Sequence, residues 1–466
     1  MVEPRIVPRE EHPISRRDID PDALKVLYRL RQYEYTAYLV GGSVRDLFLG
    51  RRPKDFDIGT SAHPYQVKKL FRNCWIIGRC FRLAHVKFGQ KVIEVATFRR
   101  QVAAGEEVVQ DGVPAPDPTT PEGEHLIHRD NTFGTPEEDA FRRDFTINAL
   151  FYDIANFSII DYVGGLDDLR AGLVRSIGDP DVRLKEDPVR MIRAIALAAR
   201  LDFTIEPTLL ESIRAHRQEI AKSSPPRLLE EYYKILRAGS SEKAFRGLAE
   251  VGLLQPISSE LHKGAAEPLW QALASLDAYR RRFDSMPDTL SNGILLGSLL
   301  VPLGISLHPA RGAGTRDQVE SRSRSGGDQV ESRSSAGGDE VGGRSDRTPR
   351  RAPGPRLGEL PLARRDIERL RLIVSLQRRL RDLSASPKAQ RALAHRAIFR
   401  EALTWLEIHG GAPELVEHWK VILAEGASTQ ETADAPDASA EDPRGLRPQR
   451  RRRRRRRRRG APTPGS

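Results

Sequence analysis

The chain has 466 residues, enough for about two to four domains with hydrophobic cores of their own, and its 39% hydrophobic and 30% charged residues exclude a largely membrane-embedded protein. The formal net charge is +12, but the arginine run 450–459 supplies ten of these charges and leaves 12 − 10 = +2 for the remainder. The two cysteines, Cys74 and Cys80, exclude a disulfide framework and a metal knuckle, so we expect small core residues in a reducing, cytoplasmic compartment.

The sequence predicts neither export nor a membrane span. The first 20 residues carry charges where a signal peptide needs an apolar core. The longest apolar stretch, GILLGSLLVPLGISL at 293–307, is too short and too often interrupted by Gly and Pro to span a bilayer. It predicts a buried helix.

Strand and helix patterns alternate in the first part of the chain. Asp20 and Pro21, a cap and a first-turn proline, predict a helix to about residue 32. AYLV predicts a short strand that a Gly-Gly turn joins to a helix starting near Val44, and FDIGT predicts the next strand. Residues 80–98 predict two strands around a turn at Gly89 and Gln90. RRDFTINAL, further on, predicts the start of an apolar helix.

The second part of the chain is predicted to be helical. Apolar residues recur at helical spacing over 187–254 and 360–423. Between them, an eleven-residue repeat with a single Val in each copy cannot bury a core and predicts a disordered insertion. We therefore divide the chain into an N-terminal extension (1–20), a mixed α/β head (21–165), a helical neck (166–255), a helical body (256–310 and 357–425), a disordered insertion (311–356) and a disordered arginine-rich tail (426–466).

Two aspartates in GRRPKDFDIGT are the first candidates for chemistry. In an extended chain, Asp55 and Asp57 point the same way with Cα atoms about 6.5 Å apart, so both carboxylates can converge on bound cations. Upstream, the strand ending in Gly41 and Gly42 passes directly into a helix, whose first N–H groups suit a phosphate. The spacing predicts that a phosphate site and a metal site share one edge of a sheet.

The motifs resemble a known family. A Gly-Gly turn, a helix and an Asp-x-Asp strand resemble the nucleotidyltransferase superfamily related to DNA polymerase β. More narrowly, VGGSVRDLFLGRRPKDFDIGT, RRDFTINALFYD and EDPVRMIRAIALAARLDF resemble the class II group, which holds tRNA CCA-adding enzymes and bacterial poly(A) polymerases. The resemblance covers about residues 15–255. It implies a polymerase β-like mixed sheet flanked by helices, followed by all-α neck and body domains.

The resemblance also implies roles for individual residues. Asp55 and Asp57 would be ligands of two Mg²⁺ ions, with Glu94 as a third carboxylate, although an ion pair of Glu94 with Arg82 or Arg99 is the alternative. Arg143 and Asp144 would support the site and read the ribose 2′-hydroxyl. Asp187 and Arg190 would read the incoming base, with a plain helical ion pair as the alternative. The full set of nucleotide-binding candidates is Gly41, Gly42, Ser43, Arg45, Arg142, Arg143, Asn148, Asp187 and Arg190, and Asp144 joins the three carboxylates as a catalytic candidate.

Three cues favour the poly(A) polymerase form, which transfers AMP from ATP to RNA 3′ ends. WIIGRCFRLAHVKFG and the continuation of RRDFTINAL resemble that form, and an arginine tail suits an enzyme that grips unrelated RNAs, with Arg450, Arg451, Arg452, Arg453 and Arg454 on the phosphates. RNA-decay proteins are possible further partners. A tRNA CCA-adding enzyme is the alternative. The intact Asp55, Asp57 and Asp144 argue against an inactive RNA-binding protein.

Overall fold

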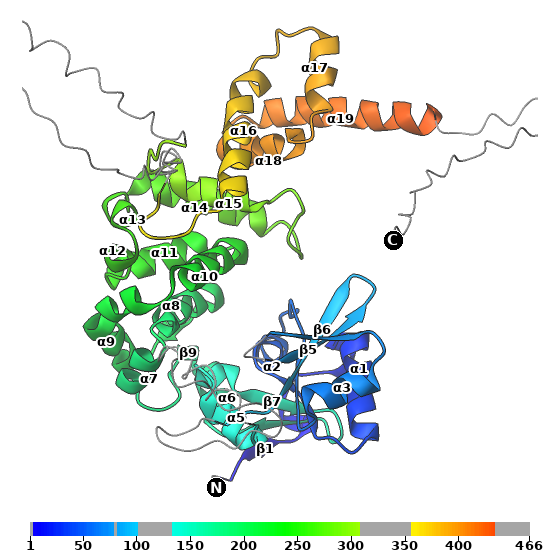
Figure 1. Ribbon diagram of the computed structural model, residues 1–466, viewed down its shortest axis with the longest axis vertical. Coiled ribbons are helices and arrows are strands. Elements are labelled where there is room, and N and C mark those ends of the chain that lie inside the picture. The colour runs from blue at the N-terminus through cyan, green and yellow to red at the C-terminus, as the bar shows by residue number, and fades with distance from the viewer. Residues whose placement is uncertain (1–2, 79–81, 101–132, 308–355, 434–466) are drawn as a thin grey trace, which may run out of the picture.

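The computed structural model describes residues 3–78, 82–100, 133–307 and 356–433. A head that contains the large sheet joins a series of helices along one side of the molecule, and the last helices lie at the far end, so the described chain forms an arc (Figure 1). The predicted fold class, a mixed α/β head followed by helical neck and body, is confirmed.

The head is built on an eight-stranded mixed sheet with the order β1-β8-β7-β2-β3-β6-β5-β4. β3 and β6 run parallel, and the other neighbouring strands run antiparallel. The hairpin predicted around Gly89 and Gln90 is confirmed as β5 and β6. The strands are β1 (Arg5–Val7), β2 (Ala37–Val40), β3 (Asp57–Thr60), β4 (Cys74–Ile77), β5 (Leu83–Phe88), β6 (Lys91–Thr97), β7 (Leu150–Asp153) and β8 (Ser158–Asp161).

Helices cover one face of the half-sheet formed by β3, β6, β5 and β4. Along β6, Ile93 and Val95 are buried in the core while Glu94 between them is exposed, because successive side chains of a strand point to opposite faces. Helix α3 (Pro64–Leu70) packs against β4, β5 and β6, and α1 (Pro21–Gln32) packs against β2 and β3. The opposite face of these strands carries the candidate carboxylates.

The predicted start of α1 is confirmed, because the Asp20 side chain accepts a hydrogen bond from the Asp22 N–H at 2.8 Å. The strand predicted from AYLV is β2, and helix α2 (Gly42–Phe48) begins two residues before Val44. Cys74 is buried in the core as predicted, and Cys80 lies outside the described residues.

The structure differs from the sequence predictions at two places in the head. RRDFTINAL does not begin a helix: α5 (Pro136–Arg142) ends there, a short 3-10 helix Thr146–Asn148 follows, and then β7 starts. All residues of β7 are buried, so an apolar run that fits a buried helix face here fills a central strand. In addition, β1 pairs with β8, so the head sheet extends into the segment 1–20 that the sequence set apart.

The neck is helical except for one small parallel pair of strands. Asp187 lies at the break between α7 and α8, where Pro188 disfavours a helical conformation for the residue before it. The elements are α6 (Gly165–Ala171), β9 (Leu173–Val174), α7 (Pro180–Glu186), α8 (Val189–Leu201), β10 (Thr204–Ile205), α9 (Pro207–His216), α10 (Pro225–Ala238), α11 (Ser241–Glu250), α12 (Leu254–Ile257) and α13 (Ser259–Lys263).

The body contains α14 (Glu267–Arg280), α15 (Asn292–Leu300), α16 (Arg364–Leu380), α17 (Pro387–Ala394), α18 (Phe399–His409) and α19 (Pro413–Ala433). The buried helix predicted from GILLGSLL is confirmed as α15. Helix α19 continues past residue 426, where the composition predicted a disordered tail. Residues 311–355 of the predicted insertion and the arginine run lie outside the described residues.

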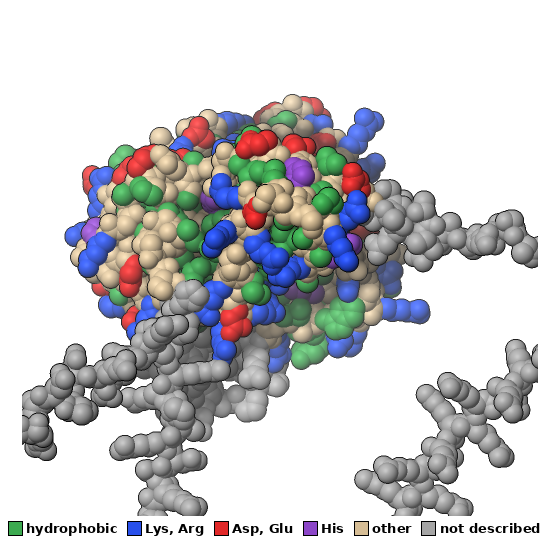
Figure 2. Space-filling model, turned by 90° about the horizontal axis from the view of Figure 1, so that it is seen from above, with side chains coloured by type: hydrophobic (Ala, Val, Ile, Leu, Met, Phe, Trp, Pro, Cys, Tyr) green, Lys and Arg blue, Asp and Glu red, His purple; other side chains and the backbone are tan. Residues whose placement is uncertain are grey.

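Seen from above, the body end of the molecule carries a band of Lys and Arg side chains (Figure 2). Arg365, Arg378 and Arg379 of α16 are among the exposed basic residues of this part of the chain. Within the residues that the structure describes, no helix is both long and apolar enough to cross a membrane.

Candidate active site

The Gly-Gly turn and the aspartate strand meet at one edge of the sheet, as predicted. Val40 of β2 faces Asp57 of β3 in the antiparallel register, so Gly41, the next residue after Val40, lies beside Asp57. The Gly41 N–H donates to the Leu150 carbonyl at 3.0 Å, which attaches the turn to β7. On the other side of β3, Asp57 faces Glu94 of β6 in the parallel register.

The three carboxylates differ in their surroundings. The pKa of Asp57 is raised to about 6, mainly by loss of hydration in the cleft. The charges of Glu94 and Asp55 also raise it, and the charge of Arg143 lowers it. Part of the Asp57 side chain is still exposed to solvent. Asp55 precedes β3 and its side chain is mostly exposed, 3.5 Å from Lys54. Among the described residues, Glu94 lies against His85, with 3.4 Å between Nε2 and Oε1, and not against Arg82 or Arg99, the partners that the sequence left open as the alternative to a cation.

Arg143 occupies the space above the Gly-Gly turn. Its guanidinium donates to the Asp139 carboxylate and, through Nη1 at 3.1 Å, to the Asn148 carbonyl. A Cβ on Gly41 would come within 2.9 Å of that Nη1, and Gly41 has φ of +70°. Glycine is therefore required here both for the backbone conformation and for the approach of the guanidinium.

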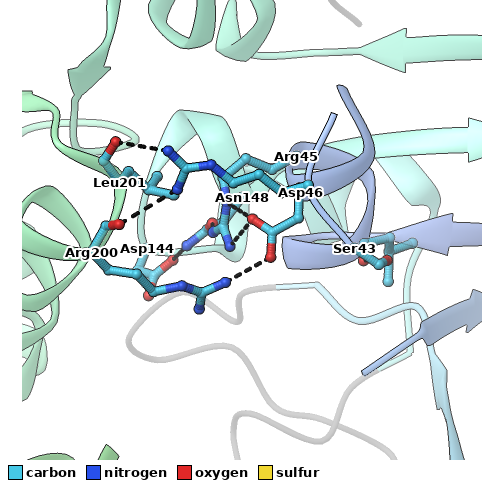
Figure 3. Close-up of polar contacts among 9 residues, drawn as sticks. Ser43, Arg45, Asp46, Asp144, Asn148, Arg200 and Leu201 are labelled. Atoms are coloured by element: carbon cyan, nitrogen blue, oxygen red, sulfur yellow. Dashed lines mark hydrogen bonds and ion pairs between the residues drawn. The ribbon is translucent and has the colours of Figure 1, made fainter. Parts of the chain in front are cut away.

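A chain of polar contacts runs from the neck through α2 to Asp144 (Figure 3). The Arg200 guanidinium donates to Asp46 Oδ2 at 2.6 Å, and the buried Arg45 guanidinium donates to Asp46 Oδ1 and to the Asn148 side-chain carbonyl. The Asn148 amide donates in turn to Asp144 Oδ1 at 3.1 Å. Asp144 also accepts from the Phe145 N–H at 2.9 Å, so its position is fixed from two sides.

These groups line one side of a cleft of about 740 Å³ between head and neck. Of the residues that the sequence singled out, the cleft brings together Gly41, Gly42, Arg45, Asp57, Arg142, Arg143, Asp144, Asn148, Asp187 and Arg190. It does not include Asp55, Glu94 or Ser43 in its lining. The Ser43 side chain is buried and donates to the Val40 carbonyl at 2.9 Å, so its hydroxyl is committed to holding the turn.

The neck side of the cleft contains cations that the sequence analysis did not select: Arg193, Arg200, Arg227 and Lys234. Arg193 and Lys234 both contact Glu231, at 3.0 Å each. A signal for two of them was present in the sequence, because Arg190, Arg193 and Arg200 recur at helical spacing within one motif.

Asp187 and Arg190 are not the helical ion pair that the sequence left open as an alternative. Asp187 precedes α8 and its Oδ2 accepts from Arg227 at 2.9 Å, while Arg190 donates to the Arg183 carbonyl and to Glu186. Asp187 Oδ1 is buried and has no hydrogen-bond partner among the described residues. An unsatisfied buried acceptor is costly, and a donor on a bound ligand would satisfy it.

The donor set at the carboxylate edge suits a hard divalent cation. Loss of hydration is the main cause of the raised pKa of Asp57, and the charges of Glu94 and Asp55 add to it, so a cation between these carboxylates would offset that repulsion. Across the described ranges, no group of three or more His, Cys, Asp or Glu side chains already converges closely enough to hold a metal ion. The predicted tail arginines 450–454 lie outside the described residues.

Three family models match the chain. They are the poly A polymerase head domain over residues 37–175, the "Probable RNA and SrmB-binding site of polymerase A" over 202–264, and the polymerase A arginine-rich C-terminus over 356–459. The head match contains the carboxylate edge and the Gly-Gly turn, and the second match contains the α10 side of the cleft.

The curated proteins with similar sequences include poly(A) polymerases and CCA-adding enzymes. The chain is 51% identical to poly(A) polymerase I of Salmonella typhi over 253 residues, which are 54% of this chain and 53% of that protein. It is 37% identical to the CCA-adding enzyme of Lactobacillus johnsonii over 235 residues, 50% of this chain and 54% of that enzyme. The chain therefore spans about half the length of the curated relatives it matches.

The crystal structure of the CCA-adding enzyme of Bacillus stearothermophilus in complex with CTP has the same fold. The match has a TM-score of 0.51 at 21% identity and covers 90% of both chains. The likeness extends over the head and the helices that follow it, including the part of the chain that the curated relatives do not match.

Proposed function

We propose that this chain, as a member of the class II nucleotidyltransferase family of bacterial poly(A) polymerases and tRNA CCA-adding enzymes, acts on RNA. It adds AMP from ATP to RNA 3′ ends without a template. The observation that carries the proposal is the cleft itself, which is lined by Asp57, the Gly-Gly turn and several arginines. The higher identity to poly(A) polymerase I than to the CCA-adding enzyme favours polyadenylation.

Asp55 and Asp57, with Glu94 nearby, are the residues that would hold two Mg²⁺ ions. When bound, such ions lower the pKa of an attacking 3′-hydroxyl and neutralise the triphosphate and the leaving pyrophosphate. Among the chain's own residues, strand register holds Asp57 beside Glu94 at this edge, and the exposed Asp55, which precedes β3, would turn toward a bound cation.

Arg143 and the Gly-Gly turn are proposed to bind the triphosphate. The absence of a side chain at Gly41 lets the Arg143 guanidinium lie directly above the turn, where it would contact a phosphate bound there. Asp144, held by Asn148 and the Phe145 N–H, is the acceptor proposed for the ribose 2′-hydroxyl.

Asp187 and Arg190 are proposed to read the base. The free Asp187 Oδ1 accepts from an exocyclic amine such as that of adenine, while Arg227 holds the other carboxylate oxygen in place. A pocket that loses a buried hydrogen bond with the wrong base rejects that base strongly. The basic surface of α16 and the arginine run 450–459 are proposed to hold RNA phosphates regardless of sequence.

One experiment tests the function. The full chain is incubated with Mg²⁺, a generic RNA and each of the four NTPs separately, and in parallel with a tRNA that lacks its CCA end. We expect long extension with ATP alone. Addition of C, C and A to the tRNA followed by a stop would establish the CCA-adding alternative. No extension in either reaction would support the third alternative, an inactive RNA-binding protein.

The proposed location is the cytoplasm, because the chain uses only two cysteines and the described one is a free thiol. RNA-decay proteins are proposed as further partners, since an enzyme that extends RNA 3′ ends works on the same substrate ends as exonucleases.

A further inference from the structure

We propose that the outer edge of the sheet, at β4, forms a second RNA subsite, where bases upstream of the 3′ end stack on Trp75 and Tyr65 between Lys68 and Arg82. We call these four residues the edge hollow. The inference rests on the proposed function, because it locates the substrate RNA behind its reacting end. Three independent observations carry it: strand register, exposed aromatic rings and charge.

The register connects the edge hollow to the carboxylates. Trp75 faces His85, His85 faces Glu94, and Glu94 faces Asp57, so the four residues form one row across β4, β5, β6 and β3. Facing residues on neighbouring strands place their side chains on the same side of the sheet, so Trp75 lies on the carboxylate face, whereas Tyr65 and Lys68 belong to α3, which covers the other face. The edge hollow therefore lies at the outer edge of the sheet, where RNA from the carboxylate face would pass around β4. Three strand spacings put Trp75 about 14 Å from Asp57, a distance that a few nucleotides of single-stranded RNA can span.

The aromatic rings of the edge hollow are open to solvent. Trp75 is 53% exposed and Tyr65 is 56% exposed, and they line a hollow of about 450 Å³ at the outer strand β4. The other tryptophans, Trp270, Trp405 and Trp419, are at most 8% exposed. Two large rings that share one hollow at the surface are the platform on which unpaired bases stack.

The charge of the edge hollow selects a polyanion. Of the residues that the structure describes, Lys68 and Arg82 line it together with the rings, and no acidic side chain does. Over the described ranges neither cation has a carboxylate within ion-pair distance, and Arg82 lies over the Tyr65 ring at 5.7 Å. Rings for the bases and unpaired cations for the phosphates are the combination that binds single-stranded RNA. A protein strand pairing with β4 would need neither the rings nor the cations.

The first test is binding without ATP, which does not depend on catalysis. Trp75 is the exposed fluorophore of the full chain, so stacking of an oligoadenylate of about ten nucleotides should quench its emission and protect it from acrylamide. The RNA-dependent change should disappear in Trp75→Phe, which keeps a ring for packing. Binding seen by anisotropy with no change at Trp75 would overturn the proposal, as would occupation of β4 by a protein instead of RNA.

The second test separates the subsite from the reaction. Tyr65→Ala combined with Trp75→Ala should raise the KM for the long oligoadenylate about tenfold, with kcat and the KM for ATP unchanged. A dinucleotide primer, too short to reach the edge hollow, should show the same KM in both proteins. The matched control is Tyr33→Ala, which removes a 50% exposed tyrosine with an arginine, Arg29, over its ring at 5.6 Å.

The outcomes distinguish the two proposals. If the wild-type chain adds no nucleotide, the proposed function fails, and the fluorescence titration still decides whether RNA occupies the edge hollow. If the wild type extends RNA and the double variant has an unchanged KM for the long primer, the function stands and the edge hollow is overturned. Thermal unfolding of the double variant, compared with Trp75→Phe, checks that a raised KM is not lost folding.

Discussion

The two sides of the cleft are built by different means. On the head side, Asp57 and Asp144 are positioned by strand register and by hydrogen bonds to near neighbours in the chain. On the neck side, Arg190, Arg193 and Arg200 lie along one helix, and their partners come from α7, α10 and α2. On the proposed function, the head side therefore holds the reacting groups rigidly, and the neck side supplies charge and hydrogen-bonding groups for recognition.

This comparison predicts different losses from substitutions on the two sides. Replacements on the head side should reduce turnover, and replacements on the neck side should reduce selectivity or raise KM. The following predictions test that difference.

The largest effect is expected at the carboxylate edge. Asp57→Ala and Asp55→Ala should each reduce the adenylation rate at least about a thousandfold, or roughly 4 kcal/mol of barrier, because each removes an expected cation ligand. Single-turnover assays with saturating RNA measure this. Asp167→Ala, which removes an exposed aspartate of α6 outside the cleft, is the control and should keep wild-type turnover. Near wild-type turnover of Asp57→Ala in Mg²⁺ would contradict the assignment of the reacting edge.

The next effect tests whether activity depends on the close approach of the Arg143 guanidinium to Gly41. Gly41→Ala should reduce kcat/KM about a hundredfold, because the new Cβ displaces the Arg143 guanidinium from above the turn, an effect comparable to losing one transition-state donor. Gly50→Ala is the matched control: Gly50 has a similar φ of +65°, and nothing lies within 4 Å of its added Cβ. Gly41 combines φ of +70° with ψ of −131°, a backbone conformation that L-residues rarely adopt, so the difference between the two variants contains both this backbone strain and the contact with Arg143. Equal losses in the two variants would assign the effect to the backbone alone.

A smaller and different loss is expected on the neck side. Asp187→Asn should reduce the preference for ATP over the other NTPs about tenfold, because its free oxygen is the acceptor proposed for the base amine. Turnover with saturating ATP should change less than twofold. Competition assays with pairs of NTPs measure the preference. A large loss of kcat without loss of preference would place Asp187 with the reacting groups and break the comparison.

The smallest effect is a pH dependence of stability. Because the pKa of Asp57 is raised from 3.8 to about 6, the folded chain binds a proton in that range that the unfolded chain does not, and stability decreases as pH rises through this window. Asp57→Asn should remove this decrease and gain about 1 kcal/mol at neutral pH, after allowance for the solvent that reaches the side chain. Denaturant titrations at several pH values measure it; an unchanged pH dependence in Asp57→Asn would show that Asp57 titrates normally. Activity has the opposite trend and should decrease as pH falls below about 6.

The motifs predicted more of the head than of the neck. The Gly-Gly turn, the aspartate strand and the β5–β6 hairpin were all predictable, because each depends on residues close together in the sequence. RRDFTINAL was predicted as a helix and is a 3-10 turn followed by a buried strand, because strand neighbours from elsewhere in the chain override local periodicity.

The sequence by itself determined which residue types this protein has for chemistry: two aspartates two residues apart, a Gly-Gly turn, an arginine pair and the motif proposed to read the base. Only the tertiary structure decided which of them meet. The pairing of Glu94 with His85, the contact of Arg200 with Asp46 and the row from Asp57 to Trp75 all join residues that are far apart in the chain or on separate strands. The physical reason is that strand register and helix packing depend on the whole core, and one residue of slip in strand register would turn the strand side chains of this row to the opposite face.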